Sequence, residues 1–411
     1  MDTRRLGPVA VTAALALLAA GCGSRGAKAG DANAGGTLTL GASLSLTGSL
    51  VHEGKLTQEG YDVCVKVVND KGGVKAGGKT YKLAISYQDD TSKADTAGQL
   101  VDQFNDKGVK LILGPYGSAT TESTAAVVER NGQVMADSAG ADDKIFSKGY
   151  QRTFAVLSPA KIYVASMVQA VYDLATPRPA TVAFISADDG FSKTATQGGL
   201  ARAKELGFTV VAEEYVPNGT SDVSSALTKI KAKNPDMVFA SVHLPEGVAI
   251  IKQSKELGVH PTGGFAETVA PPTPDFVKTL GASAEGVLAS TQWTVRTSGK
   301  DDWFGTAGDY ARTFAAQFSG REPEYHNAEA TAACLALVLA VQKAGSTDPD
   351  KVREALSTMD EQSFFGPLKF TPQGQNITKQ MGVIQIQGGK PVAVWPKAAA
   401  EAPLKWPGGQ A

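Results

Sequence analysis

Short, unbroken apolar runs alternate with helical stretches along this sequence, and this alternation limits the fold more than any other feature. The runs include "VKLILG", "TVAFIS" and "DMVFASV", and a strictly alternating run, "TLTLGASLSL", begins at Thr37. Unbroken apolar runs between helices indicate parallel strands that are covered on both faces. The stretch 53–69 places its apolar residues on one helical face, and 94–107 reads as another helix. The pattern therefore predicts an α/β fold with doubly wound, Rossmann-like sheets.

The length of the chain allows two such sheets. Its 411 residues are enough for two domains and a sizeable core. After Trp303 the pattern changes to helices over 303–318, 327–344 and 349–359, and a hairpin around Gly388 closes the fold. The net charge is −1, with 20% charged residues. Because nucleic acids and anionic membrane surfaces attract proteins with a basic excess, neither is indicated as a partner.

The N-terminal residues have the pattern of an export signal. Arg4 and Arg5 precede "PVAVTAALALLAAGC", an apolar run too short to span a bilayer. We interpret 1–21 as a signal peptide whose end, "LAAGC", resembles a bacterial lipobox, although Ala19 stands where leucine is usual. In that motif Cys22 is lipidated and becomes the first mature residue. The alternative is an ordinary signal peptide that contains a cysteine.

A flexible tether follows the predicted lipidation site. Residues 22–36 contain no apolar residue larger than alanine beyond Cys22 itself, so they cannot bury enough surface to fold. The lipid and the tether predict a folded part that works outside the cytoplasm, anchored to the outer face of the membrane. Cys64 and Cys334 are the remaining cysteines. They can pair in an oxidising compartment, or remain buried free thiols in apolar helices, and the sequence leaves both open.

Sequence motifs of catalysis and cofactor binding either lack the structural context that they require or do not occur in this chain. The letters "GVKAGGKT" over 73–80 match a phosphate loop, but here a helix precedes and a strand follows, so we interpret them as a turn. No nucleophile elbow, zinc-protease motif or Cys-x-x-Cys pair occurs. The four histidines have no metal-ligand spacing: His52, His243, His260 and His326. The sequence therefore predicts no enzyme, no cofactor and no metal site.

The stretch "LILGPYGSATTESTAAVVERNG", residues 111–132, predicts a binding feature instead. A buried strand ends at Gly114-Pro115, and Ser118, Thr120 and Thr121 stand where the next helix begins. A helix N-terminus presents unpaired N–H groups and a partial positive charge, which suit a carboxylate or a similar oxygen. The hydroxyls would add donors. The alternative is that Ser118 caps its own helix.

Several segments together resemble a known family. They are "SLTGSLVHEG", "VNDKGGV", "SYQDD", "LILGPYGSATT", "ISADDGFSKTATQGGLARAKELG", "DMVFASVHLPE", "SAEGVLAS" and "FGPLKFTPQG". Their order and spacing, from Thr37 to Trp395, resemble the branched-chain amino acid (leucine/isoleucine/valine-binding) type of solute-binding proteins of bacterial ABC transporters.

The resemblance implies a type I periplasmic-binding-protein fold, in which two α/β lobes are joined by three hinge crossings and close on a ligand. By likeness the crossings fall near Leu157, Thr291 and Gly366. Lobe one then comprises 37–157 and 292–366, lobe two comprises 158–291 and 367–396, and 397–411 forms a C-terminal tail.

The resemblance also implies ligand-binding residues in lobe one. Ser118 matches the serine that holds the ligand's carboxylate in the family, and Ala139 falls where a backbone carbonyl meets the ligand's ammonium. Ala141 stands where the family has a threonine that touches both groups. This replacement removes a donor and an acceptor, so we expect leucine, isoleucine and valine to bind poorly.

Three further residues fall at ligand positions of lobe two. Phe191 and His243 occupy aromatic positions, and Glu267 aligns with an ammonium-binding glutamate. The alternatives are core packing for Phe191, a surface loop for His243 and a solvated loop carboxylate for Glu267. Four acidic residues in nearby loops are interpreted as helix caps, with a bias toward a cationic ligand as the alternative: Asp142, Asp143, Asp188 and Asp189.

The function implied is the capture of a small polar solute, amino acid-like or amide-like, by a monomeric protein that delivers it to ABC permease and ATPase subunits. A second class is a ligand-sensing receptor of the same fold that signals closure to another partner. The sequence does not separate these two.

Overall fold

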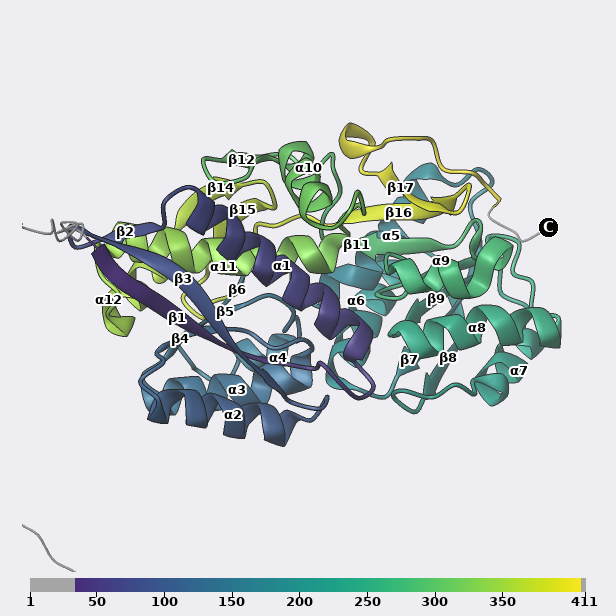
Figure 1. Ribbon diagram of the computed structural model, residues 1–411. Coiled ribbons are helices and arrows are strands. Elements are labelled where there is room, and N and C mark those ends of the chain that lie inside the picture. The colour runs from purple at the N-terminus through teal and green to yellow at the C-terminus, as the bar shows by residue number, and fades with distance from the viewer. Residues whose placement is uncertain (1–33, 408–411) are drawn as a thin grey trace, which may run out of the picture.

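The computed structural model describes residues 34–407 and places them in two lobes, each built on its own sheet (Figure 1). The first sheet has the strand order β2-β3-β1-β4-β5-β6, and all neighbours except β2 and β3 are parallel. Its strands are β1 (Ala34–Leu44), β2 (Val74–Ala76), β3 (Lys79–Asp89), β4 (Leu111–Leu113), β5 (Val134–Asp137) and β6 (Thr153–Ala155).

The second sheet has the order β17-β16-β11-β10-β9-β7-β8, with five parallel strands and an antiparallel hairpin at one edge. Its strands are β7 (Thr181–Ala187), β8 (Thr209–Val216), β9 (Met237–Ser241), β10 (Phe265–Glu267), β11 (Leu288–Thr291), β16 (Gly382–Gln387) and β17 (Lys390–Trp395). Two small hairpins complete the strands: β12 (Lys300–Asp301) with β13 (Gly305–Thr306), and β14 (Asp360–Ser363) with β15 (Gly366–Lys369).

Helices follow most of the strands. Around the first sheet lie α1 (Val51–Asp70), α2 (Ala94–Asp106), α3 (Ser118–Asn131), α4 (Asp143–Phe146), α10 (Ala307–Gln317), α11 (Tyr325–Ala344) and α12 (Pro349–Ser357). Around the second lie α5 (Lys161–Leu174), α6 (Gly190–Glu205), α7 (Ser224–Lys233), α8 (Leu244–Leu257) and α9 (Pro274–Leu280), with 3-10 turns η1 (Gly281–Ala284) and η2 (Lys397–Ala399).

Both sheets are covered on two faces, as the apolar runs predict. In β4, Leu111 and Leu113 belong to the apolar cluster under α1 and α11, whereas Ile112 belongs to the cluster on the opposite face. In β7, Phe184 and Ile185 likewise belong to different clusters. Because successive side chains of a strand point to opposite faces, these assignments require a helical layer on each side. The prediction of doubly wound α/β sheets is confirmed.

The first lobe is braced by a disulfide between two long helices. The structure joins Cys64 of α1 to Cys334 of α11, a bond that the sequence left open. Helix α11 is buried along most of its length and packs against α1, which explains its apolar sequence on all sides. The bond therefore ties a surface helix of this lobe to its central one.

Hydrogen bonds join the three chain segments that pass between the lobes. The backbone N–H of Ser158 donates to Gln292 Oε1 over 3.1 Å, and Ser158 Oγ donates to the carbonyl of Lys379 over 2.9 Å. Lys379 Nζ in turn donates to the carbonyl of Gln292 over 2.6 Å. All three residues are buried, so the crossings form one hydrogen-bonded unit.

The third crossing lies at residues 379–381, later than the predicted position near Gly366. Leu368 and Phe370 are buried in the apolar cluster of the first lobe, and the N–H of Ala155 donates to the carbonyl of Gly374. The segment after Gly366 therefore belongs to the first lobe, because its apolar side chains are buried there.

The two ends of the described chain also differ from expectation. Strand β1 begins at Ala34 and not at Thr37, because backbone pairing with Thr80 and Tyr81 of β3 needs no large side chains. The C-terminal residues pack on the second lobe, where Trp406 Nε1 donates to the carbonyl of Pro177 over 2.9 Å. The predicted signal peptide, the lipidation site Cys22 and the tether up to residue 33 lie outside the described residues.

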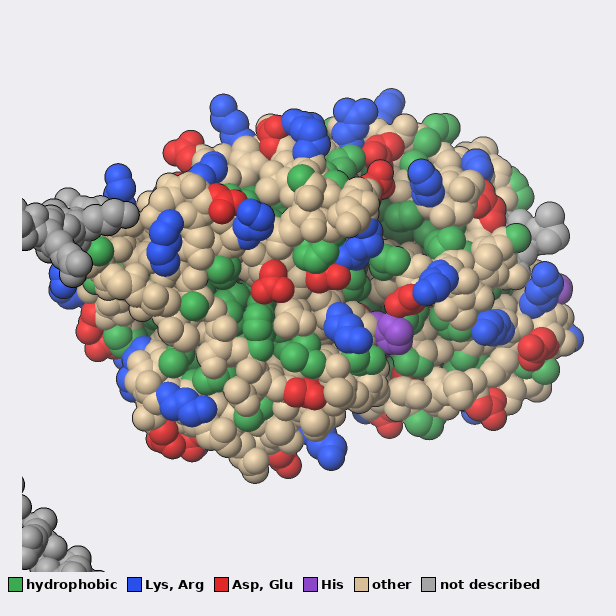
Figure 2. Space-filling model, in the orientation of Figure 1, with side chains coloured by type: hydrophobic (Ala, Val, Ile, Leu, Met, Phe, Trp, Pro, Cys, Tyr) green, Lys and Arg blue, Asp and Glu red, His purple; other side chains and the backbone are tan. Residues whose placement is uncertain are grey.

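The face of the molecule seen in Figure 2 carries basic and acidic side chains intermixed across both lobes. This distribution agrees with the near-zero net charge.

Candidate ligand-binding site

Residues from both lobes meet around a small cavity at the carboxyl ends of the strands. Tyr116, Gly117 and Ser118 follow β4, and Ala139 follows β5; on the other side Phe191 follows β7, His243 follows β9 and Val269 follows β10. Tyr163 of α5 and the start of α11 complete the lining with Tyr325, His326 and Glu329. The space between them, with the solvent at its mouth included, is about 290 Å³. This is the position at which open α/β sheets bind ligands.

The cavity is covered in this conformation. Of the lining residues, all but Gly117 and Ala139 are buried, and His243 and Ser118, at 8% exposed, are the most accessible of the buried ones. Contacts between the lobes close the rim. Thr194 Oγ1 of α6 donates to Asp142 Oδ1 over 2.9 Å, and His52 Nδ1 of α1 lies 2.7 Å from Asp275 Oδ2 of α9. A solute therefore reaches the cavity only when the lobes separate.

Ser118 presents its hydroxyl to the cavity and does not cap its own helix. The N-cap of α3 is Gly117, whose φ of 91° lies in the region that favours glycine, and no side chain caps this end. Ser118 Oγ accepts a hydrogen bond from the N–H of Asp142 over 3.1 Å. Because a hydroxyl is both acceptor and donor, its hydrogen remains available to a ligand oxygen.

The neighbouring threonine hydroxyls are directed elsewhere. Thr120 Oγ1 donates to the carbonyl of Gly117 over 2.7 Å, and Thr121 Oγ1 donates to the same carbonyl over 2.9 Å. The expectation that these hydroxyls serve as ligand donors is wrong, because they are bonded to the turn that precedes the helix. Ser118 and the first-turn N–H groups, which the helix itself cannot satisfy, remain as the anion-binding feature.

Aromatic rings form much of the lining. Tyr163 and Phe191 meet edge to face with ring centroids 5.1 Å apart, and Phe191 lies 5.7 Å from the ring of His243. On the opposite wall the ring of His326 stacks on Tyr325 at 4.0 Å and lies 5.5 Å from Tyr116. Phe191 is thus both packed in the core and part of the cavity, so its two interpretations are not exclusive.

His243 is a buried member of the lining, and the surface-loop alternative is wrong. Burial alone lowers the pKa of His243, but the hydrogen bond and the charge of Asp189 outweigh it, with help from Glu53 and Glu246, and raise that pKa to about 9. Its Nε2 lies 3.3 Å from Asp189 Oδ2, and its Nδ1 has no hydrogen-bond partner among the described residues. Asp189 also caps α6 by accepting from the N–H of Ser192, as Asp142 caps α4.

Glu329 is the acidic group of the cavity, and the sequence reasoning missed it. It is 2% exposed, and its Oε2 has no hydrogen-bond partner within residues 34–407. Burial, together with the charges of Glu324 and Asp137, raises the pKa of Glu329, while the charge of Lys379 opposes this effect. A signal was present, because Glu329 is the single acidic residue of α11, a helix that is buried along most of its length.

Glu267 and Ala141 do not line the cavity. Glu267 is fully buried in β10, and both its carboxylate oxygens lack partners among the described residues. It packs against Gly247, where an added Cβ would lie 2.5 Å from Glu267 Oε2, and burial beside Glu246 raises its pKa. The solvated-loop alternative is therefore wrong. Ala141 is buried in the core, and its carbonyl accepts from the N–H of Ala160 over 2.8 Å.

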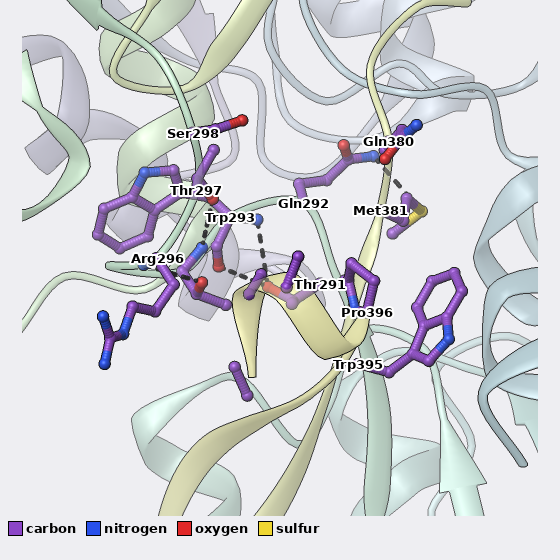
Figure 3. Close-up of a pocket in the computed structure, with 15 residues that line it drawn as sticks. Thr291, Gln292, Trp293, Arg296, Thr297, Ser298, Gln380, Met381, Trp395 and Pro396 are labelled. Atoms are coloured by element: carbon purple, nitrogen blue, oxygen red, sulfur yellow. Dashed lines mark hydrogen bonds between the residues drawn. The ribbon is translucent and has the colours of Figure 1, made fainter. Parts of the chain in front are cut away.

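A larger hollow of about 690 Å³ lies beside the hinge, between the second and third crossings (Figure 3). Its polar groups bond to one another. Thr291 Oγ1 donates to the carbonyl of Trp293 over 2.8 Å, and the N–H of Thr294 donates to Thr297 Oγ1 over 3.0 Å. Among the described residues, no buried side-chain polar atom that lines it lacks a partner. The smaller cavity has, on both walls, buried polar atoms without partners among residues 34–407: Glu329 Oε2 and His243 Nδ1. It is therefore the candidate site.

Residues 34–407 contain no group of three or more His, Cys, Asp or Glu side chains arranged to hold a metal ion. Within the same residues no single helix has the length and apolarity to cross a membrane, although the bent pair α11 and α12 passes that test when taken together.

Comparison with known proteins identifies the family. The sequence profile described as periplasmic binding protein matches residues 37–390. The chain belongs to the periplasmic binding protein family. The resemblance seen in the sequence is confirmed, and so is the prediction of a binding protein and not an enzyme, because the relatives are solute-binding proteins. Membership also implies a location outside the cytoplasm.

Its relatives are similar at low sequence identity. The Leu/Ile/Val-binding protein homolog 8 of Brucella abortus (strain 2308) is 24% identical over 364 residues, which cover 84% of this chain and 87% of that protein. The leucine binding protein LivK of Thermotoga maritima MSB8 superimposes with a TM-score of 0.77 at 21% identity, over 87% of this chain and 97% of that one.

Two neighbours were solved with a small molecule. The branched-chain amino acid transporter substrate binding protein LivJ of Streptococcus pneumoniae, in complex with isoleucine, has a TM-score of 0.74 at 20% identity and covers 86% of this chain and 97% of its own. A solute-binding protein of an ABC transporter from R. palustris, in complex with benzoate, has a TM-score of 0.73 at 16% identity and covers 89% and 98%. These likenesses establish the fold.

Proposed function

We propose that this protein is the lipid-anchored solute-binding protein of an ABC importer and captures a small polar solute between its lobes. The observation that carries this proposal is the covered cavity, which has polar groups of both lobes around it and contacts between lobes at its rim. The relatives support the transport role, since several are described as ABC transporter binding proteins.

Ser118 and Ala139 are the proposed ligand contacts of lobe one, and Phe191 and His243 are those of lobe two. The free hydrogen of Ser118 and the first-turn N–H groups of α3 suit a carboxylate or amide oxygen of the solute. Isoleucine and benzoate, held by two structural neighbours, both carry a carboxylate. Leucine, isoleucine and valine are expected to bind this chain poorly, because Ala141 stands where the family resemblance implies a ligand-binding threonine; in this conformation Ala141 is packed in the core and does not line the cavity.

The experiment that tests this function is identification of the solute. The protein, purified gently from its own cells, is analysed by mass spectrometry for a co-purifying small molecule. That molecule, added back, raises the unfolding temperature in proportion to its concentration over Kd and shrinks the particle in small-angle scattering. Uptake of the same solute is lost when the gene is deleted, which separates transport from sensing. A saturating ligand that leaves the scattering unchanged contradicts closure.

Substitution of Cys22 tests the proposed anchor. A single lipidated cysteine at the end of a polar tether is the membrane attachment that the sequence offers. Cys22→Ser is therefore expected to move the protein from the membrane fraction to the soluble fraction or to leave it unprocessed. If the variant stays in the membrane fraction, the lipid anchor is contradicted. The proposal of solute binding does not depend on this result.

A further inference from the structure

Glu329 is a buried acid in the wall of the cavity. Its side chain is 2% exposed, it lines the cavity, and its Oε2 has no hydrogen-bond partner among residues 34–407. A buried carboxylate oxygen without a partner costs free energy, and one in the wall of a cavity is placed where a ligand can supply the missing partner. Glu329 is the only buried acid with an unpartnered oxygen, among the described residues, that lines this cavity.

Two further buried acids near the cavity, Glu53 of α1 and Glu246 of α8, also have carboxylate oxygens without partners among the described residues, but neither lines the cavity. The remaining charged groups around it are paired or lie outside it. His243 is paired with Asp189, and His326 Nδ1 lies 2.8 Å from Glu324 Oε2. Asp137 receives the N–H groups of Ala139 and Gly140. Lys379 does not line the cavity. Its Nζ donates to the hinge carbonyl of Gln292 and lies 4.0 Å from the ring centroid of Phe365.

Aromatic rings surround the acid. Tyr325 precedes Glu329 by one helical turn on the same face of α11, and Tyr116, Tyr163 and Phe191 line the same space. The face of an aromatic ring attracts a cation, and this attraction grows when water is excluded. Carboxylate and rings together are complementary to a positively charged nitrogen.

We propose that Glu329 binds a positively charged nitrogen of the solute, so that this chain selects ligands with an ammonium or amidinium group. This inference rests on the proposed function, because it assumes that the cavity is the solute site. It places the cation on α11 of the first lobe, on the same wall as Ser118, which receives a ligand oxygen. Glu267, the acid at the family's position, is sealed in β10 beside Gly247 and does not reach the cavity.

If Glu329 binds a cation, ligand binding releases a proton from its carboxyl group. An acid with a purely structural role would not release one. The pKa of Glu329 is raised in the empty cavity, chiefly by burial and then by Glu324 and Asp137, against the charge of Lys379. A cation placed beside the carboxylate favours its ionised form. Binding at a pH below that raised pKa therefore releases a proton, and affinity increases as the pH rises through it.

The test uses probes that differ in one charged nitrogen. The pairs are glycine betaine and tert-butylacetate, γ-aminobutyrate and valerate, and benzylamine and benzyl alcohol, and the standard amino acids and their amides extend the panel. Thermal unfolding and calorimetry are measured on the full chain, on Glu329→Gln, on Glu267→Gln, and on Glu122→Gln, a surface control of α3. The stabilising probes are expected to carry the charged nitrogen. Glu329→Gln then raises their Kd by about 10- to 100-fold.

Each outcome decides the proposal. Calorimetry in buffers of different ionisation enthalpy is expected to show proton release by the wild type that is absent in Glu329→Gln. If the binders lack a cationic nitrogen, or if Glu267→Gln weakens them while Glu329→Gln does not, the proposal is overturned and solute binding stands. If no probe binds the wild type, an amino acid-like or amide-like solute is contradicted as well.

Discussion

The two walls of the cavity differ in how their charges are compensated. On the first-lobe wall, Glu329 has an unpartnered oxygen and Ser118 has a hydrogen to donate. On the second-lobe wall His243 lies beside Asp189 through Nε2, its Nδ1 has no partner among the described residues, and the remaining surface is largely Phe191, Tyr163 and Val269. The first wall therefore offers the polar groups that a solute must satisfy, whereas the second covers the solute with apolar surface and one imidazole.

The carboxylate and the hydroxyl that are proposed to hold the solute both belong to the first-lobe wall. The disulfide between α1 and α11 fits this division, because α11 carries Glu329 and Tyr325. A wall that orients the ligand benefits from rigidity, since preorganised groups cost less entropy on binding.

Removal of the disulfide is expected to have the largest effect on stability. The double substitution Cys64→Ala and Cys334→Ala opens a closed loop with a sequence separation of 270 residues. Such bonds contribute about 2–5 kcal/mol to the free energy of unfolding. Urea unfolding measures the loss, and hydrogen exchange is expected to rise in α1 and α11 but not in α7 and α8. Equal loss of protection in both lobes would contradict a brace that acts on the first wall.

The charged pair on the second wall predicts a pH dependence of stability. The pKa of His243 is raised from 6.5 to about 9 by Asp189, after the opposing effect of burial. The pair therefore makes its full contribution to the free energy of unfolding, about 3 kcal/mol, below pH 6.5. This contribution is lost as the pH rises through 9. Lys379, whose pKa is lowered to about 7 by burial, contributes in the opposite direction.

The difference between wild type and His243→Gln isolates this contribution. Free energies of unfolding are measured for both proteins from pH 6 to 10, and their difference is expected to shrink as the pH rises. Asp189→Asn serves as the matched variant, because it removes the partner and retains the imidazole. A difference that does not vary with pH means that His243 is uncharged, and the second wall then carries no charge to compensate.

Ser118→Ala is expected to weaken binding by about 10- to 150-fold, because it removes one hydrogen bond to a charged or strongly polar group. It also lowers the free energy of unfolding by about 1–3 kcal/mol, since the buried N–H of Asp142 loses its acceptor. Thr120→Val is the matched control, because the Thr120 hydroxyl donates to backbone carbonyls and does not line the cavity. Calorimetry with the identified solute and urea unfolding separate the two effects. Lower stability with an unchanged Kd would make Ser118 a support for Asp142 alone.

The smallest expected effect concerns the rim between the lobes. His52 and Asp275 are paired at 2.7 Å across the two lobes, with side chains 48% and 40% exposed. Exposed pairs contribute up to about 1 kcal/mol, so His52→Gln weakens binding by no more than about 5-fold, and less at high salt. Lys66→Gln, which breaks an exposed pair within α1, is the control and leaves the Kd unchanged. If His52→Gln lowers the free energy of unfolding of the unliganded protein and leaves the Kd unchanged, the contact does not depend on closure.

The sequence predicted the parts of the site that depend on strand and helix order. Ser118, Ala139, Phe191 and His243 all follow strands of parallel sheets, and the structure brings them around one cavity. Glu267 could not be placed in this way, because β10 has three residues and the direction of one side chain in a short strand is set by its packing. The difference between an acid in the cavity and an acid beside Gly247 depends on contacts between β10 and α8.

Helix α11, which lines the cavity with Tyr325, His326 and Glu329, illustrates the same limit. Residues 327–344 were predicted as a helix, and α11 begins two residues earlier, at Tyr325, with Glu324 as its cap. Its apolar sequence on all sides indicated burial but not a direction, so nothing local showed that Tyr325, His326 and Glu329 face the other lobe.

The sequence by itself determined the elements, their order, the parallel sheets and the family, because apolar periodicity and local turn chemistry are properties of neighbouring residues. Only the tertiary structure decided which buried acid faces the cavity, that Cys64 pairs with Cys334, and that the third crossing lies at 379–381. These outcomes depend on residues far apart in the chain. They are fixed by how two lobes pack against each other and not by any single stretch of sequence.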